Sequence, residues 1–172
     1  MKKWAVILAV TCFFLQGCAA LSSDYHSLKY SDSGYSELDL KYGVYYIEYK
    51  GDETMDIEKT DSYALLRAAE LARANGYSYF VVKNHRTDVK TEERQDNYSL
   101  AESDYVPDEC DIAYQNCGRS YTVQIPVSMI TIESFKKKPK NEQKTAFNAH
   151  EAIQKIRQKY KLPAPDINTE AD

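Results

Sequence analysis

The stretch that most constrains the fold is residues 61–82, DSYALLRAAELARANGYSYFVV, which predicts a helix, a glycine stop and a strand. Apolar residues recur there at the three- and four-residue spacing of an amphipathic helix, and most of them are alanines. The helix can begin at a cap on Thr54 or Asp56 and run to about residue 75. Gly76 then supplies the left-handed residue that commonly ends a helix. The narrow, alanine-rich face predicts that this helix lies close against a sheet.

Three residues of this helix lie off its apolar face. Leu66 points to the opposite side, where it is either a single exposed leucine or a second contact. Arg67 and Glu70 are three residues apart, so their side chains lie on neighbouring turns. We interpret them as a structural ion pair, because no partner base, nucleophile or metal set accompanies Glu70 as a general acid. The sequence therefore identifies no catalytic residue.

Three segments have the composition of β-strands. Residues 40–50, LKYGVYYIEYK, are rich in β-branched and aromatic residues, and residues 77–84 are similar. Residues 121–132 show a period of two, which is typical of a half-buried strand. The residues of this third strand expected to face inward are Tyr121, Val123, Ile125, Val127 and Met129.

Pro126 restricts where the third strand can lie. Proline has no backbone N–H to donate to a ladder, so the strand is expected at a sheet edge or at a bulge. The alternation slips near Met129 and Ile130, which is consistent with a bulge at that point.

These elements, with a further helix over residues 141–161, predict an α+β fold in the order β-α-β-β-α. The expected sheet is small, three-stranded and mostly antiparallel, covered by one or two helices. The C-terminal helix carries an apolar stripe that either packs on this sheet or serves as a coiled-coil or partner-binding surface. With 172 residues, 43% hydrophobic and 28% charged, the chain is long enough for one globular domain.

The N-terminus has the features of a secretory leader. Lys2 and Lys3 precede an apolar run over residues 4–15, which is shorter than the ~20 residues that a membrane-spanning helix needs. The sequence Leu-Gln-Gly-Cys at residues 15–18 resembles the bacterial lipobox. This resemblance implies that residues 1–17 are a lipoprotein signal peptide and that Cys18 carries diacylglycerol and an acylated amino group. Two or more acyl chains hold a protein firmly on a membrane.

The lipobox also predicts location and domain organisation. Ala19 stands where an aspartate would resemble the inner-membrane retention signal of enteric bacteria, so the resemblance implies the outer membrane, facing the periplasm. Residues 18–39 are then the lipidated cysteine and a tether, residues 40–161 the α+β domain, and residues 162–172 a flexible tail.

Residues 86–120 are expected to form a polar insertion loop. Its acidic residues do not match the spacing of a Ca²⁺-binding loop. Cys110 and Cys117 are the only cysteines of the mature chain besides Cys18, so in an oxidising periplasm they are expected to form a disulfide that closes the loop. Their spacing is not that of a C-x-x-C redox motif, and a zinc site would need two further ligands. No metal or cofactor is predicted.

The net charge and the tyrosine content indicate which kinds of binding partner are expected. Removing Lys2 and Lys3 changes the net charge from −4 to −6, which argues against electrostatic binding of nucleic acid or of anionic lipid headgroups. The 15 tyrosines suit either a half-buried sheet or a tyrosine-lined binding face, because tyrosine has an apolar body and a polar tip.

Four short segments together carry a family resemblance. They are YSE at residues 35–37, YALLRAAEL at 63–71, GY at 76–77 and YFVV at 79–82. This pattern resembles the core of a family of small uncharacterised bacterial lipoproteins, over about a third of the chain. The family has no assigned activity, so the resemblance implies fold and location and assigns no catalytic residue.

The leading functional hypothesis is a non-enzymatic, membrane-anchored periplasmic lipoprotein that binds another envelope component. One alternative is a small-ligand binder or enzyme that uses the tyrosine-rich face and the acidic loop. A deep pocket that gathers Glu70, His85 or several carboxylates would favour this alternative, and a filled core would count against it. Another is an envelope-stress sensor that switches through the Cys110–Cys117 bond.

Overall fold

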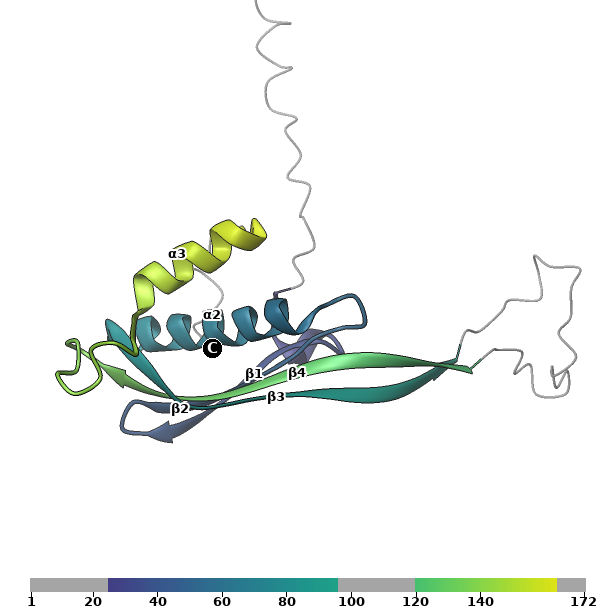
Figure 1. The fold of residues 1–172 in the computed structure, drawn as a ribbon, viewed down its shortest axis with the longest axis horizontal. Helices are drawn as coiled ribbons and strands as arrows, with labels where there is room; N and C mark the ends of the chain where they lie inside the picture. Colours follow the sequence, from purple (N-terminus) through teal and green to yellow (C-terminus); the bar gives the residue numbers. More distant parts are fainter. Residues whose placement is uncertain (1–24, 96–119, 164–172) are drawn as a thin grey trace, which may run out of the picture.

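The computed structural model describes residues 25–95 and 120–163. In these residues, one five-stranded antiparallel sheet carries two α-helices on the same side (Figure 1). The strand order across the sheet is β1-β2-β4-β3-β5. In chain order the elements are η2 (Leu28–Tyr30), β1 (Gly34–Lys41), β2 (Val44–Lys50), α2 (Ile57–Ala74), β3 (Tyr79–Gln95), β4 (Ser120–Phe135), β5 (Ala146–Asn148) and α3 (Ala149–Tyr160).

The expected three-stranded sheet in the order β-α-β-β-α is wrong, because the fold is mostly β with five strands. β1 was not expected as a strand of its own, since the sequence predicts a tether up to residue 39 and places residues 40 and 41 in the following strand. Most of its side chains are polar or exposed, so the segment lacks the apolar alternation of a buried strand. It pairs with β2 through a tight hairpin in which Tyr42 and Gly43 both have positive φ, of 55° and 80°. Such turns usually contain Asn-Gly or Asp-Gly, and that signal is missing here.

The second expected strand is much longer than predicted. β3 and β4 pair from Tyr79↔Phe135 to Gln95↔Ser120 and extend as an arm beyond α2 (Figure 1). Residues 86–95, assigned to the polar loop, are part of this arm. They are polar on both faces because α2 does not cover this part of the sheet, so the sequence shows no strand periodicity.

The predicted disulfide-closed loop is not part of the described fold. Cys110 and Cys117 lie outside the described residues, and those residues contain no disulfide bond.

β4 is central, so the expectation that Pro126 marks an edge strand is wrong. β4 pairs with β2 on one side and with β3 on the other. The carbonyl of Pro126 accepts a hydrogen bond from Gly51 N at 2.8 Å, immediately after the end of β2. In a strand, the N and the C=O of one residue point toward the same neighbouring strand, so the nitrogen of Pro126 also faces the β2 side. The ladder between β2 and β4 ends there, so the missing N–H of Pro126 breaks no hydrogen bond within it. The bulge lies on β3 instead, where Lys83 is the extra residue between Val82 and Asn84.

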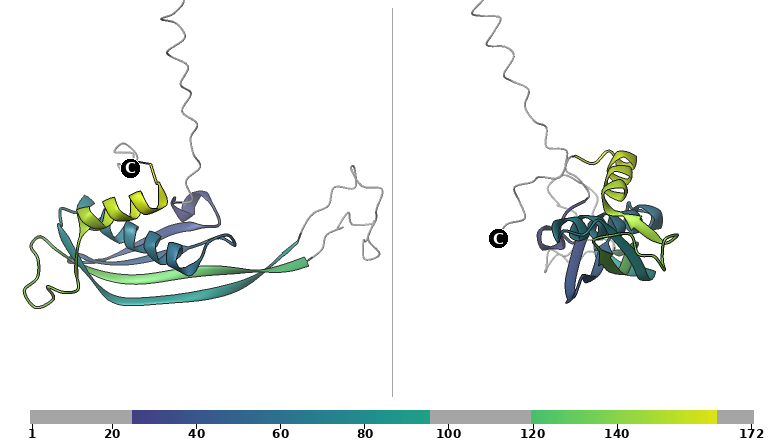
Figure 2. Two further views of the ribbon diagram at one scale, coloured as in Figure 1. Left: turned by 45° about the horizontal axis from the view of Figure 1, so that its top comes forward. Right: turned by 90° about the vertical axis from the view of Figure 1, so that its left-hand side faces the viewer.

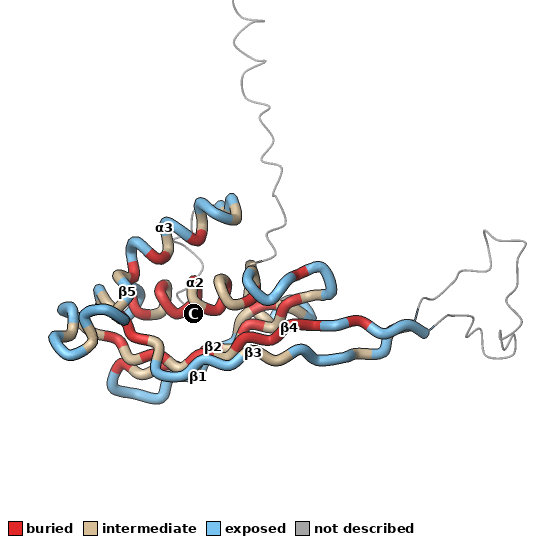
Figure 3. The backbone as a smooth tube through the Cα atoms, viewed as in Figure 1, coloured by how far each residue is buried: buried red, intermediate tan, exposed pale blue. Residues whose placement is uncertain are grey.

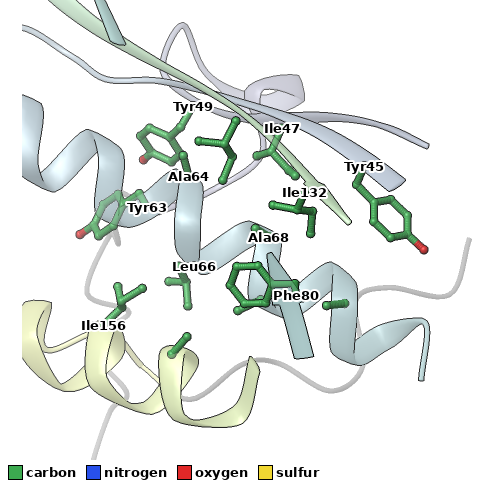
Figure 4. Packing of buried hydrophobic residues seen from close by; sticks show 14 of the residues in the cluster. Tyr45, Ile47, Tyr49, Tyr63, Ala64, Leu66, Ala68, Phe80, Ile132 and Ile156 are labelled. Atoms are coloured by element: carbon green, nitrogen blue, oxygen red, sulfur yellow. The ribbon is translucent and has the colours of Figure 1, made fainter. Parts of the chain in front are cut away.

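α2 is the helix predicted from the sequence. The side chain of its N-cap, Asp56, accepts a hydrogen bond from Lys59 N at 2.7 Å, and Gly76 follows the helix with a φ of 76°. Small side chains on α2, including Ala64 and Ala68, are fully buried and let the helix pack closely on the sheet (Figure 4).

α3 packs on the outer side of α2, so the order of layers is sheet, α2, α3 (Figures 1 and 2). Leu66 is fully buried and lies on the α3 side of α2, near Ile156 (Figure 4). It is therefore the second contact and not an exposed leucine. The apolar stripe of α3, expected to face the sheet or a partner, packs instead on α2 through its buried residues Ala149, Ala152 and Ile156.

A run of buried residues occupies the middle of β4 (Figure 3). The strand pairing shows that the buried face of β4 changes there. Its residues paired with Tyr45, Ile47 and Tyr49 of β2 lie on the face covered by α2. The β4 residues that pair with Lys50 of β2 and with the charged residues of the β3 arm lie on the opposite face of the sheet. The predicted inward residues Val123, Ile125 and Val127 are buried on this opposite face, whereas Tyr121 is exposed and Met129 half-buried.

An ion pair covers this second buried stripe. Lys50 Nζ of β2 lies 2.8 Å from Glu92 Oε1 of β3, so the pair spans β4, which runs between them. Long charged side chains can cover apolar surface with their aliphatic stems. This arrangement accounts for the complete burial of Ile125 on a face that no helix covers.

Candidate functional site

Arg67 is the centre of a network that we call the ionic clasp, formed by Tyr25, Glu37, Arg67, Glu70 and Arg157. Its side chain is only 9% exposed. Nε and Nη2 of Arg67 donate to the two carboxylate oxygens of Glu37 on β1, at 2.8 and 2.7 Å. This bidentate geometry is the strongest that an arginine and a carboxylate form. The guanidinium also lies 4.3 Å from the ring centroid of Tyr35, a favourable cation–π position.

Glu70 joins three segments of the chain. Its Oε2 accepts a hydrogen bond from the Tyr25 hydroxyl at 2.5 Å, and its Oε1 accepts from Arg157 Nη2 at 2.6 Å. Arg67 Nη1 is 3.6 Å from Glu70 Oε2, so the predicted Arg67–Glu70 pair is the longest ion pair in the clasp. Burial, and then the negative charge of Glu70, raise the pKa of Tyr25 well above its usual value, so this hydroxyl stays protonated and donates. Both carboxylate oxygens of Glu70 are thus occupied by partners from other segments of the chain.

Tyrosine rings fill the space around the clasp. Tyr25 packs on Tyr35 and Tyr63, with ring centroids 5.2 and 5.4 Å apart, and Tyr63 packs edge-on against Tyr49 and Tyr160 at 5.3 and 5.2 Å. These distances and tilted geometries are those of favourable aromatic pairs. These rings pack on one another, and the two depressions beside α3 are lined by other residues, which include Tyr77 and Tyr79.

A second polar cluster joins the first half of α2 to β3. Asp61 Oδ1 accepts a hydrogen bond from the Thr87 hydroxyl at 2.6 Å and lies 3.0 Å from His85 Nε2. Burial alone would raise the pKa of Asp61, but the hydrogen bonds from its neighbours, including Thr87 and His85, hold this pKa below its usual value.

Asp61, His85 and Thr87 are residue types that could form a catalytic triad, but their geometry is not that of a triad. In a triad the histidine uses one ring nitrogen for the carboxylate and the other for the hydroxyl. Here the same nitrogen, His85 Nε2, lies 3.0 Å from Asp61 and 3.2 Å from the Thr87 hydroxyl, which itself donates to Asp61. The cluster therefore attaches α2 to the sheet. It is also separate from Glu70, so the structure does not bring Glu70 and His85 together.

Asp61 provides a pH-dependent test of this structural role. We expect Asp61→Asn to lower the free energy of unfolding at pH 7 by about 1 kcal/mol, because a charged acceptor of partly exposed hydrogen bonds is lost. The pKa of Asp61 is lower in the folded state, so its contribution is present above pH ~4 and is lost as the pH falls further. Urea unfolding between pH 2.5 and 7 should show the two proteins converging at low pH, whereas the exposed control Asp32→Asn should change little. A constant difference across this range would contradict the prediction.

The described residues contain neither a candidate metal-binding cluster nor a candidate membrane-spanning helix. Within residues 25–95 and 120–163, no group of three or more His, Cys, Asp or Glu side chains is placed to hold a metal ion. None of the helices in the same ranges is both long enough and apolar enough to cross a bilayer. The shallow depressions beside α3 are lined by residues such as Arg73, His150 and Gln154, and Arg73 Nη1 lies 2.7 Å from His150 Nδ1.

The sheet face opposite the helices carries exposed apolar side chains. In β1, Glu37 points to Arg67 on the helix side, so its neighbour Leu38 points to the open side and is 58% exposed. Leu40, at the register shift of β1, and Tyr42, in the hairpin turn, are 46% and 98% exposed. The half-buried residues on the same face are Val44, Tyr46 and Met129. We call these six residues the open-face patch.

The residues singled out from the sequence fall into two groups. Cys18, Cys110 and Cys117 lie outside the described residues. Arg67 and Glu70 lie in the clasp, but their closest partners, Glu37, Tyr25 and Arg157, were not predicted. The comparisons with protein-family models, with curated proteins and with solved structures find no match for this chain.

Proposed function

We propose that this protein is a lipid-anchored component of the bacterial envelope, with no catalytic role, that presents the open-face patch to a protein partner. The observation that carries the proposal is the exposure of Leu38, Leu40 and Tyr42 beside the uncovered face of the sheet. Monomeric proteins seldom leave neighbouring large apolar side chains exposed unless they contact something.

The first described residue, Tyr25, and the patch lie on opposite sides of the sheet. The lipobox supports lipidation of Cys18, seven residues before Tyr25. Tyr25 is held on the helix side by Glu70 and by its neighbouring tyrosines. A chain that leaves the body on the helix side keeps the open-face patch turned away from its own attachment point.

The composition of the patch favours a protein as the partner. Leucine, methionine and tyrosine side chains are typical of the centres of protein interfaces, where tyrosine combines apolar area with a hydroxyl for hydrogen bonding. Nucleic acid would require basic residues, and the patch contains none. The alternative of a ligand binder or enzyme gains no support from the filled tyrosine cluster. The stress-sensor alternative depends on cysteines outside the described residues.

Site-specific photocrosslinking in intact cells tests the proposal. A photoreactive residue at position 38 or 42 should give one defined crosslinked product, and one at Gln154 on the exposed side of α3 should not give that product. The double variant Leu38→Lys with Leu40→Ser should abolish the product formed at position 42. Because both side chains are exposed, their replacement should change the free energy of unfolding by about 1 kcal/mol or less.

Two results would reject the proposal. One is the absence of any reproducible product at the open-face positions, and the other is a product that survives the double variant. Labelling with radioactive palmitate, compared with a Cys18→Ser chain, tests the anchor separately.

A further inference from the structure

The C-terminal part of α3 is more basic than the chain as a whole. Residues 155–161 contain four basic residues and no acidic one: Lys155, Arg157, Lys159 and Lys161. Lys155, Lys159 and Lys161 are exposed, whereas Arg157 is bound to Glu70. Lys159 also contacts Glu58 of α2, but Lys155 and Lys161 have no ion-pair partner among the described residues.

The acidic excess of the mature chain lies outside the described residues. The described residues hold 19 basic and 16 acidic residues, a net charge of +3. Residues 96–119 alone hold six acidic residues and one basic residue. The net charge of −6 that argues against contact with anionic lipid is therefore a property of the whole mature chain and not of the described residues.

The basic segment of α3 lies beside the point where the described chain begins. Tyr25 and Arg157 bind the two oxygens of the same carboxylate, that of Glu70, and the Arg157 guanidinium is 5.9 Å from the Tyr25 ring. Figure 2 shows the first described residues and α3 on the same side of the sheet. Cys18 is seven residues from Tyr25, so even a fully extended chain spans only about 25 Å between them.

We propose that the basic C-terminal end of α3 rests on the anionic headgroups of the membrane that holds the lipid anchor. This inference rests on the proposed lipidation, because a lipid at Cys18 keeps α3 near the bilayer surface. Positive side chains near an anionic membrane are attracted to it over about one Debye length, roughly 10 Å at 0.1 M salt. The contact fixes the orientation of the body, with α3 toward the membrane and the open-face patch toward the aqueous side.

Vesicle flotation with the non-lipidated mature chain tests this contact without the anchor. The protein is residues 18–172 with Cys18→Ser, and every residue of the hydrophobic core lies within residues 25–162. It should bind vesicles of phosphatidylcholine with 30% phosphatidylglycerol at about 50 mM salt, release at about 500 mM, and not bind phosphatidylcholine alone. The double variant Lys155→Glu with Lys161→Glu should lower the partition coefficient by about 25-fold or more, since each basic residue contributes about fivefold.

The matched control is Lys136→Glu with Lys137→Glu, which makes the same charge change just after β4. This control should bind the anionic vesicles nearly as well as the parent chain. Thermal unfolding of all three proteins checks that they are folded, because basic residues near the end of α3 also stabilise the helix dipole.

Three results would overturn the inference. They are no binding of the folded parent chain to anionic vesicles, equal binding to neutral vesicles, and an equal or greater loss in the control than in the α3 variant. A chain that binds through α3 but takes no palmitate at Cys18 would reject the proposed anchor while leaving the basic surface of α3 established, so the two failures are distinguishable.

Discussion

Replacing Leu66 with alanine is expected to lower the free energy of unfolding by about 2 to 5 kcal/mol. Leu66 is fully buried in the main core, on the side of α2 that faces α3. The residues of α3 in the core are Ala149, Ala152 and Ile156, with Ile153 and Tyr160 partly buried. Removal of the leucine side chain would leave a cavity between the two helices that its neighbours fill only in part.

Urea unfolding followed by circular dichroism measures this effect, and Ile57→Ala is the matched control. Ile57 is also an aliphatic residue of α2 but is 50% exposed, so its truncation should cost about 1 kcal/mol or less. Hydrogen exchange should also show faster exchange in α3 of the Leu66→Ala protein than in its β2–β4 pair. Equal losses for the two substitutions would show that α3 does not form a third layer on α2.

The part of the fold that was predictable from the sequence is the part determined locally. α2 has its own cap, its own apolar period and its own glycine stop within 21 consecutive residues, so no distant contact is needed to recognise it. β1 has none of these signals. It is a strand because β2 offers it a partner and because Glu37 reaches Arg67, and neither condition can be recognised from residues 34–41 alone.

The β3–β4 arm was missed for a similar reason. Alternation of apolar and polar residues arises where one face of a strand is buried, and α2 covers only the first part of the arm. Beyond it, β3 presents charged or polar residues on both faces, and the sequence is indistinguishable from that of a loop. The apolar residues of β4 in this region, such as Ile125, are covered by a charged pair from two other strands.

The clasp could be predicted only in part. Arg67 and Glu70 are close in sequence and on one helix, so their proximity follows from helical geometry. Glu37 is 30 residues from Arg67, and Arg157 is 87 residues from Glu70, so these pairs depend on the complete fold. The sequence places Tyr25 in the tether. Its aromatic side chain is the one feature that could have indicated a buried position.

Replacing Arg67 with methionine is the second change with a large expected effect. The guanidinium is buried and compensates the charge of Glu37, which is 31% exposed, and part of the charge of Glu70, which is 14% exposed. Removing one partner of a buried pair leaves the other desolvated without compensation, so we expect a loss of about 3 kcal/mol. Arg86→Met is the matched control, because Arg86 is 71% exposed and pairs with Asp88 on the surface of the arm. An exposed pair of this kind contributes about 1 kcal/mol or less.

The double variant Glu37→Gln with Arg67→Met separates the pair from the rest of the clasp. If the bidentate contact carries the effect, the double variant should be less destabilised than the sum of the two single variants, with a coupling of about 1 to 3 kcal/mol.

Arg67 also contacts Tyr35, which packs on Tyr25, so the loss of Arg67 should increase hydrogen exchange from residue 25 to residue 37. Strict additivity, together with unchanged exchange in this segment, would show that β1 and the first described residues are held by aromatic packing alone. In that case the position of Tyr25 beside α3, and the orientation that follows from it, would depend on the tyrosine cluster and not on the clasp.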